Sequence, residues 1–216
     1  MRKVGLVSVT LNAVNPLMEY LLAEAKDIKT VNYLDTGLQD LVNREGGVTD
    51  LSLSRLLAIL ARTVEDGVEA VLLTCTVFSP YVDSLRSIFS FPLIAVDDVM
   101  LEEAVRRGGK TTILCTFPPT MKTSEAGFRK AEQRLGLSRE LELVLVPGAY
   151  EALARGDKSI HDGMILEKIK EVEAQCDIIV LAQISMAGAA AMATSCSKPI
   201  LTSPRAALSA LRETLT

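Results

Sequence analysis

The chain has 216 residues, of which 49% are hydrophobic and 23% are charged, and its formal net charge is −4 at pH 7. These values are typical of a soluble globular protein, and the acidic balance with no long basic run argues against a nucleic-acid partner. Every apolar run is far shorter than the roughly 20 residues that a membrane-spanning helix needs, so no membrane partner is expected either.

Eight apolar segments along the chain predict strands. The first residues, MRKVGLVSVT, enter a strand pattern at once and show no signal-peptide pattern, so we predict an untargeted, cytoplasmic protein. Amphipathic stretches between the strands, such as 51–67 and 159–175, repeat apolar residues at helical spacing. This alternation predicts an α/β fold with parallel sheets covered on both faces. The predicted strands are 4–9, 30–35, 69–75, 92–96, 111–116, 142–147, 177–183 and 199–203.

The second half of the chain repeats the first. The segment EAVLLTCTVFSP aligns with DIIVLAQISMAG, which places Cys75 on Gln183, and the same offset places Asn12 on Thr120. Two more pairs follow in order, YLDTGLQDL with VLVPGAYEA and FPLIAV with KPILTS. Such a duplication predicts two similar flavodoxin-like lobes related by a pseudo-dyad. We place the lobes at 1–96 and 97–203, the first completed by a C-terminal helix over 204–216.

Open parallel sheets bind ligands beyond the carboxyl ends of their strands. Two facing lobes would bring these ends into one cleft, with Cys75 opposite Gln183. The polar side chains at these ends form the candidate site: Thr10, Asn12, Cys75, Thr76, Thr116, Thr120, Gln183 and Ser185.

Cys75 ends a predicted strand and precedes a predicted helix, for which Ser79 is a plausible N-cap and Pro80 the first residue. A helix dipole at that place lowers the pKa of a thiol below about 8.5 and favours a nucleophilic or basic thiolate. The alternative interpretation is a buried small hydrophobic residue, which is the commonest fate of a cysteine outside disulfides.

The hydroxyl groups of Thr76, Thr116, Thr120 and Ser185, with backbone N–H groups at helix starts, could form an anion cradle in each lobe. Two cradles would suit a dicarboxylate or an amino-acid carboxylate. The alternative is that the hydroxyls cap helices, Thr120 above all. No lysine or arginine falls on the turns that face the predicted cleft, which disfavours a phosphate-rich ligand.

The other chemistry-bearing residues are predicted to be structural. The four cysteines show no CxxC spacing, and His161, the single histidine, is assigned to a charged helix far from the strand ends. We therefore predict neither a metal site nor a disulfide. Nucleotide-binding glycine motifs are absent, and no cofactor is expected. The cysteines assigned to core or loop positions are Cys115, Cys176 and Cys196.

Three motifs in this order resemble the aspartate/glutamate/hydantoin racemase superfamily: LLTCTVFSP at 72–80, TTILCTFPPTMKTS at 111–124 and VLAQISMAG at 180–188. The resemblance covers nearly the whole chain. It implies cofactor-independent chemistry at a carbon next to a carboxylate, in a homodimer or larger assembly. In such racemases one thiolate removes the α-proton from one face and a second thiol returns a proton to the other. Two groups are needed because one acid cannot comfortably reach both faces of a planar carbanion.

The resemblance makes Cys75 the first of the two cysteines. Residues that it assigns to the substrate are Asn12, Thr76, Val77, Thr116 and Thr120, although the last two stand one residue further apart than in the common form of the turn. The chain departs from the family at the second cysteine, where Gln183 stands, and an amide cannot give up or take a proton near neutral pH. Gln183 could instead hold a carboxylate or stabilise an enediolate. Ser185 is a conceivable substitute acid, although no base is placed to activate it.

Three hypotheses follow. The leading one is a cofactor-free enzyme of this superfamily that acts beside the carboxylate of a small amino or dicarboxylic acid, with Cys75 as thiol acid, base or nucleophile. One form of it is a racemase with a weak non-thiol partner. The second hypothesis is a single-cysteine lyase of decarboxylase type or a cis-trans isomerase. The third is a catalytically silent protein that binds a small acid in the same cleft.

Overall fold

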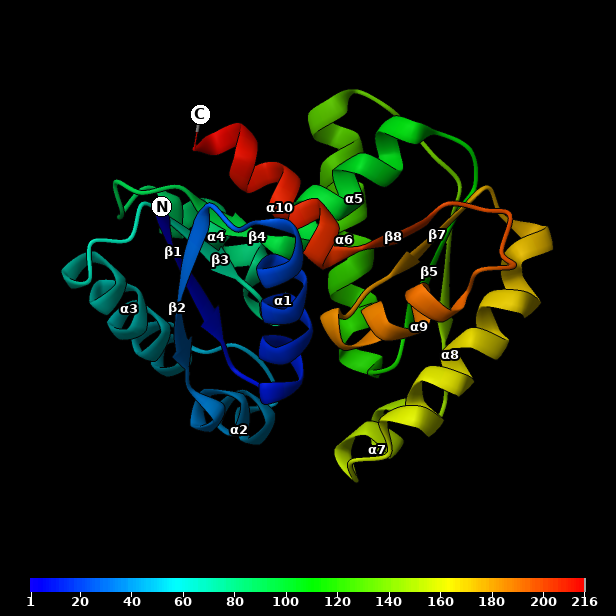
Figure 1. Cartoon of the computed structure of the whole chain (residues 1–216), viewed down its shortest axis with the longest axis horizontal. Helices are drawn as coiled ribbons and strands as arrows, with labels where there is room; N and C mark the ends of the chain where they lie inside the picture. The colour runs from blue at the N-terminus through cyan, green and yellow to red at the C-terminus, as the bar shows by residue number, and fades with distance from the viewer. Residues whose placement is uncertain (216) are drawn as a thin grey trace. The chain divides into compact units, whose positions relative to one another are not determined.

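The computed structural model describes residues 1–215 and contains all eight predicted strands (Figure 1). Each strand lies within a few residues of its predicted bounds, because runs of valine, isoleucine and leucine between turn residues specify buried strands. The strands are β1 (Arg2–Ser8), β2 (Ile28–Leu34), β3 (Ala70–Leu73), β4 (Leu93–Ala95), β5 (Thr111–Cys115), β6 (Leu141–Leu145), β7 (Ile178–Leu181) and β8 (Ile200–Thr202).

Helices connect the strands, and three short 3₁₀ turns occur within the described residues. The α-helices are α1 (Leu11–Glu24), α2 (Thr36–Glu45), α3 (Asp50–Glu65), α4 (Val82–Arg86), α5 (Val96–Arg107), α6 (Pro118–Leu135), α7 (Ala149–Ala154), α8 (Lys158–Val172), α9 (Ala187–Met192) and α10 (Ser203–Thr214). The 3₁₀ turns are η1 (Thr76–Tyr81), η2 (Glu173–Gln175) and η3 (Ile184–Met186). None of the helices among residues 1–215 is long and apolar enough to cross a membrane.

The strands form two four-stranded parallel sheets, ordered β2-β1-β3-β4 and β6-β5-β7-β8. The orders are identical once the second half is numbered from β5, which confirms the predicted pair of flavodoxin-like lobes. Contacts divide the chain into two units. Unit 1 comprises Met1–Val96 and the chain from Ala207 onward, and unit 2 comprises Asp97–Ala206.

The register of the sheets corrects one detail of the predicted repeat. Val7 pairs with Leu73 in unit 1, and Leu114 pairs with Leu181 in unit 2. The third strands therefore correspond with the offset that places Cys75 on Gln183, but the first strands are shifted by one residue. The predicted equivalence of Asn12 and Thr120 is consequently wrong by one position.

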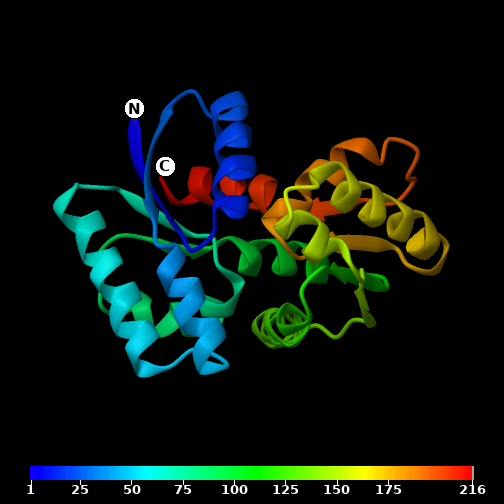
Figure 2. The same cartoon turned by 90° about the horizontal axis from the view of Figure 1, so that it is seen from below.

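Helices cover both faces of the sheet in unit 1. Figure 2 shows α1 on one face and α2 and α3 on the other. The second face holds a core in which Leu38 of α2, Leu56 and Leu60 of α3 and Phe78 are all fully buried. Helix α3 begins at a capping box, because Thr49 and Ser52 each accept a hydrogen bond from the other's backbone N–H.

The sheet of unit 2 is covered in the same way. One core contains Met100 of α5 and Phe128 of α6, and the other contains Ile165 of α8 and Ala189 of α9. Because helices in these connections run antiparallel to the strands, the first turn of α8 lies at the edge of the sheet where the strands end. That edge is where the predicted site residues of unit 2 lie.

Candidate functional site

In unit 1, the end of β3 is fastened to the end of β1 by a buried hydroxyl pair. The Thr74 hydroxyl lies 2.9 Å from Ser8 Oγ and 3.3 Å from the Val7 carbonyl oxygen, and the Thr74 N–H donates to that same carbonyl. Ser8 and Thr74 are not among the predicted site residues, although each is a polar residue at the end of an apolar strand segment. The pair fixes the backbone immediately before Cys75.

Cys75 follows as the N-cap residue of η1 and is 8% exposed. The predicted start of the following helix is wrong, since Ser79 and Pro80 lie inside this six-residue 3₁₀ turn and the α-helix, α4, begins only at Val82. A short 3₁₀ turn aligns few peptide dipoles, so the helix-dipole argument for Cys75 loses most of its force. The position of the thiol at a strand end is as predicted.

The other predicted site residues of unit 1 lie at the same sheet edge. Thr10 is the N-cap residue of α1, although its side chain makes no capping hydrogen bond. Asn12 is exposed in the first turn of α1. Thr76 and Val77 are half-buried in η1, directly after Cys75. These four residues thus follow the two central strands of the sheet, β1 and β3.

An ion pair that the sequence did not reveal lies at the end of β2. Asp35, the N-cap residue of α2, accepts two hydrogen bonds of 2.6 Å from the Arg55 guanidinium and one from the Leu38 N–H. Gly37 leaves room for this arginine, because a Cβ there would lie 2.6 Å from Arg55 Nη2. Asp35 raises the pKa of Arg55 through the hydrogen bond and its charge. The prediction covered only basic residues on the turns themselves. Arg55 lies on α3 and reaches the turn after β2 from there.

In unit 2, Gln183 occupies the position of Cys75 as the residue before a 3₁₀ turn, and both ends of its amide are engaged. The Thr116 N–H donates to Gln183 Oε1 at 3.2 Å, and Gln183 Nε2 donates to Thr120 Oγ1 at 2.8 Å. The orientation of the amide is fixed, because a backbone N–H can only donate and must face the oxygen. One N–H of Nε2 takes no part in these two hydrogen bonds.

The predicted anion cradle at the start of α6 is not supported. The first two residues of this helix are Pro118 and Pro119, which have no N–H to offer. The Thr120 N–H and hydroxyl both donate to the Phe117 carbonyl oxygen, at 3.0 and 2.6 Å. The hydroxyl donates to a carbonyl and so caps no free N–H of α6, and the capping role that the sequence left open is not borne out either. The same hydroxyl accepts the hydrogen bond from Gln183.

Ser185 lies in η3 and is half-buried. No side-chain hydrogen bond joins its hydroxyl to another residue between 1 and 215, so nothing there activates it. A charged cluster stands close by, since a Cβ on Gly188 would lie 2.6 Å from Lys158 Nζ and 2.8 Å from Asp162 Oδ2. Lys158 and Asp162 are themselves paired at 2.5 Å.

His161 belongs to this cluster. Its imidazole is fully buried, with Nδ1 2.8 Å from Asp162 Oδ1. The prediction that His161 lies far from the strand ends is wrong, because the first turn of α8 packs beside Gly188, just beyond the end of β7. The helical pattern places His161 on α8, but it does not show which end of the sheet that turn reaches.

The remaining cysteines fit their predicted structural roles. Cys115 is fully buried, and burial raises the pKa of its thiol to about 11. Burial also raises the pKa of Cys176, whose Sγ lies 3.4 Å from the Val172 carbonyl oxygen. None of the cysteines, all of which lie in the described part of the chain, is in a disulfide. Residues 1–215 contain no group of three or more His, Cys, Asp or Glu placed to hold a metal ion.

The chain is similar to known proteins in its sequence pattern and in its fold. The family model described as Asp/Glu/Hydantoin racemase matches residues 45–211, a span that includes both Cys75 and Gln183. The chain belongs to the Asp/Glu/hydantoin racemase family. No curated protein sequence matches this family member.

Solved structures of racemases share the fold of this family member at low identity. The aspartate racemase of Picrophilus torridus is 12% identical, with a TM-score of 0.73 over 94% of this chain and 90% of that one. An aspartate racemase homologue from Pyrococcus horikoshii is 17% identical, with a TM-score of 0.72 over 99% and 98%. The allantoin racemase of Klebsiella pneumoniae is 15% identical, with a TM-score of 0.73 over 100% and 88%.

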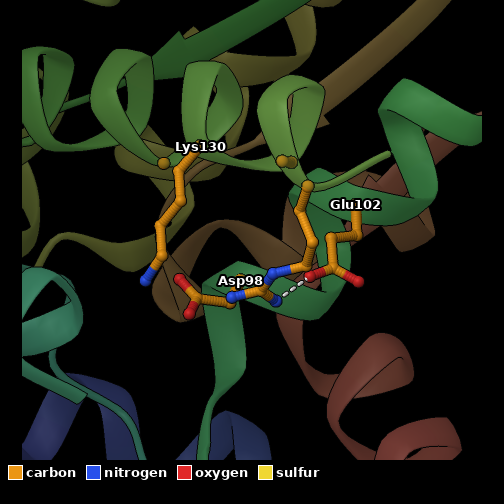
Figure 3. Close-up of a pocket in the computed structure, with 6 residues that line it drawn as sticks. Asp98, Glu102 and Lys130 are labelled. Atoms are coloured by element: carbon orange, nitrogen blue, oxygen red, sulfur yellow. Dashed lines mark hydrogen bonds and ion pairs between the residues drawn. The ribbon is translucent and has the colours of Figure 1, made fainter. Parts of the chain in front are cut away.

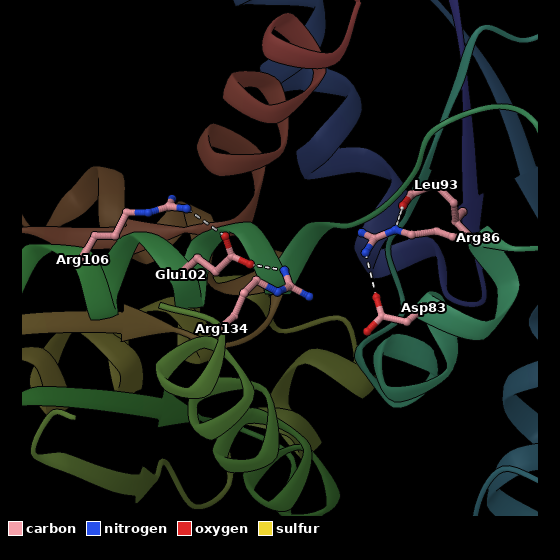
Figure 4. A network of polar contacts seen from close by, with 6 residues as sticks. All are labelled: Asp83, Arg86, Leu93, Glu102, Arg106 and Arg134. Atoms are coloured by element: carbon pink, nitrogen blue, oxygen red, sulfur yellow. Dashed lines mark hydrogen bonds and ion pairs between the residues drawn. The ribbon is translucent and has the colours of Figure 1, made fainter. Parts of the chain in front are cut away.

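A hollow on unit 2 of this racemase-family chain is too small for a substrate. It lies between α5 and α6, and Figure 3 shows Asp98, Glu102 and Lys130 around it. Its cavity volume of about 10 Å³ is enough for one water molecule. Glu102 accepts hydrogen bonds from Arg106 and Arg134 in its wall (Figure 4). The hollow is thus a narrow gap between α5 and α6, beside which the Glu102 carboxylate is paired with two arginines.

A second polar contact in Figure 4 belongs to unit 1. Arg86 donates to Asp83 Oδ1 and to the Leu93 carbonyl oxygen, both at 2.8 Å. These bonds fasten α4 to the start of β4. Neither polar network in Figure 4 includes a residue of the candidate site.

Proposed function

We propose that this chain is a cofactor-independent enzyme that moves a proton at the carbon beside the carboxylate of a small amino or dicarboxylic acid, with Cys75 as the thiol acid or base. Family membership and the place of Cys75 at the end of the third strand of unit 1 support the proposal. The proposal also includes that the chain is an isomerase of the racemase type, that it acts in the cytoplasm and that it forms a homo-oligomer.

The hydrogen-bonded amide of Gln183 supports a specific role for this residue in the proposed reaction. Gln183 stands where the repeat predicts the second proton carrier, but an amide does not titrate near neutral pH. Its hydrogen bonds to Thr116 and Thr120 hold the side chain in one orientation. Its remaining N–H can donate to a substrate carboxylate or to the oxyanion of an enediolate. We therefore assign proton transfer to Cys75 and charge stabilisation to Gln183.

A single proton carrier favours chemistry on one face of the substrate. In exchange, the Cys75 thiolate takes the α-proton and the electron pair moves into the carboxylate as an enediolate. The thiol then exchanges this proton for one from water and returns the new proton to the same face. In a lyase reaction the C–C bond to a second carboxyl group breaks, CO₂ leaves, and the thiol protonates the enediolate. The thiolate then regains its proton from water. Addition of the thiolate to a double bond, followed by rotation and elimination, would give cis-trans isomerisation.

Proton exchange in deuterated water tests this proposal. The protein is incubated with alanine, aspartate, phenylglycine, phenylmalonate and maleate, and deuterium incorporation, optical rotation and products are followed. We expect turnover or one-face exchange that Cys75→Ala reduces about 100- to 10,000-fold, as for loss of a proton-transfer group. Cys115→Ala is the matched control, because it also removes a thiol at a strand end.

Two results would overturn parts of the proposal. Deuterium exchange with inversion would show a second proton carrier and thus ordinary racemisation, which overturns the one-face chemistry and leaves the racemase-type assignment. Binding of these acids without any turnover, and unaffected by Cys75→Ala, would instead identify a small-acid binding protein.

A further inference from the structure

An aromatic pair borders the Gln183 cluster of unit 2. The rings of Phe117 and Tyr150 are stacked, with centroids 4.6 Å apart and an interplanar angle of 27°. Phe117 is half-buried and Tyr150 is 39% exposed, so part of the pair faces outward. An exposed stacked pair at the ligand-binding edge of a parallel sheet is the kind of apolar surface that binding sites use.

The backbone ties this pair to the proposed reaction centre. Phe117 directly follows Thr116, whose N–H binds Gln183, and its own carbonyl oxygen accepts both hydrogen bonds of Thr120. Thr116 and Phe117 follow β5, which lies between β6 and β7 in the sheet. Gln183 reaches the end of β5 from the β7 side. Tyr150 reaches it from the β6 side, just after Gly148, whose φ of 79° turns the chain there.

The charges at the sheet edges disfavour a second carboxylate on the substrate. Helices bring Arg55 in unit 1 and Lys158 in unit 2 to the carboxyl ends of the strands. Each is already paired, Arg55 with Asp35 and Lys158 with Asp162. The segments 116–120 and 183–186, which carry the Gln183 cluster, contain no basic residue. A side-chain carboxylate held beside Gln183 would therefore lose its hydration without gaining a cation from these two segments.

We propose that Phe117 and Tyr150 select substrates whose α-carbon carries an aryl group, so that the preferred acids are 2-aryl acids and arylglycines rather than aspartate or glutamate. This inference rests on the proposed function, which it narrows. The carboxylate lies at the Gln183 N–H, and the aryl ring extends toward the β6 side of the cluster and packs against the aromatic pair. Stacking of this kind gives about tenfold in affinity.

Binding of phenylacetate tests the aromatic pair without requiring turnover. Calorimetry compares phenylacetate with acetate and succinate on the wild-type protein and on Phe117→Leu and Tyr150→Leu. We expect phenylacetate to bind most tightly, and each substitution to weaken it about tenfold while acetate binding changes less than twofold. Phe91→Leu is the matched control, since Phe89 and Phe91 form a second stacked pair in unit 1 with centroids 5.1 Å apart.

Succinate binding more tightly than phenylacetate would overturn the inference, as would equal weakening of phenylacetate by Phe91→Leu. Thermal unfolding of each variant shows whether it is folded, and an unfolded Phe117→Leu leaves Tyr150→Leu to decide. The same measurements on Cys75→Ala keep the two proposals apart. If Cys75→Ala turns over phenylglycine normally but still binds phenylacetate through Phe117, the proposed function fails and the aryl site stands.

Discussion

Replacement of Gln183 by alanine tests the hydrogen-bonded cluster at the end of β7. The substitution removes the acceptor of the Thr116 N–H and the donor to Thr120 Oγ1. Thr116 is only 5% exposed, so water reaches its N–H poorly and the group is left without a partner. An orphaned buried donor costs about 1–3 kcal/mol. For a protein of this size, a loss of about 2 kcal/mol lowers Tm by roughly 4–8 °C.

Amide hydrogen exchange locates this effect. In Gln183→Ala the Thr116 amide should exchange at least about tenfold faster, while amides in the centre of unit 1 keep their protection. Gln183→Glu separates the two bonds, because a carboxylate still accepts from Thr116 but no longer donates to Thr120. We expect its Thr116 amide to remain protected. Gln175→Ala removes an exposed glutamine and serves as the control. Unchanged protection of Thr116 in Gln183→Ala, with Tm within 1 °C of wild type, would refute the reasoning.

Three further predictions concern single groups of the structure. Gly188→Ala places a Cβ 2.8 Å from Asp162 Oδ2, so chemical denaturation should show a loss of about 1–3 kcal/mol. Gly163→Ala, which meets no atom within 4 Å in the middle of α8, should instead stabilise by about 0.5–1 kcal/mol, and equal effects at both sites would contradict the packing argument. Burial raises the pKa of Cys115 to about 11, so its thiolate is scarce below that pH and iodoacetamide should label it slowly at pH 7–9. Mass spectrometry that finds Cys115 labelled faster than exposed cysteine peptides at pH 7 would disprove this. Burial alone would raise the pKa of Glu132, but hydrogen bonds from Arg129 and the Arg139 N–H outweigh it and lower the pKa. A lowered pKa means that the ionised side chain stabilises the fold above about pH 4.3 and that this stability is lost as the pH falls through the folded-state pKa. Glu132→Gln should therefore be less stable than wild type at pH 7 and should lose less stability on acidification, and parallel pH profiles of the two proteins would rule the effect out.

The sequence predicts the fold well because its signal is local. Apolar strands, helical spacing and the repeated EAVLLTC and DIIVLAQ segments are each read within about ten residues. The two parallel sheets follow from them. The predicted start of the helix after Cys75 is wrong for the same reason, since Ser79 and Pro80 form a good local start but lie in a 3₁₀ turn with Phe78 buried, and α4 begins only at Val82.

The candidate site is less predictable because its contacts join residues far apart in the sequence. The position of Cys75 and Gln183 at strand ends follows from the repeat. The bonds from Gln183 to Thr116 and Thr120 cross more than sixty residues, and the Arg55 pair with Asp35 depends on how α3 packs. The absence of an anion cradle at the start of α6 was predictable from the sequence, because Pro118 and Pro119 have no N–H groups. The predicted cleft between the lobes stays a prediction.

The return of the chain to unit 1 has a consequence for how the protein is made. Unit 2 is one continuous stretch, whereas unit 1 is completed by the chain from Ala207 onward. Arg212 donates to the Glu24 carbonyl oxygen, and Arg2 donates to that of Leu215. During synthesis, unit 2 can therefore finish folding while unit 1 still waits for its last helix to leave the ribosome. The unit that carries Cys75 is then the second of the two to close, although its first strand is the first to be made.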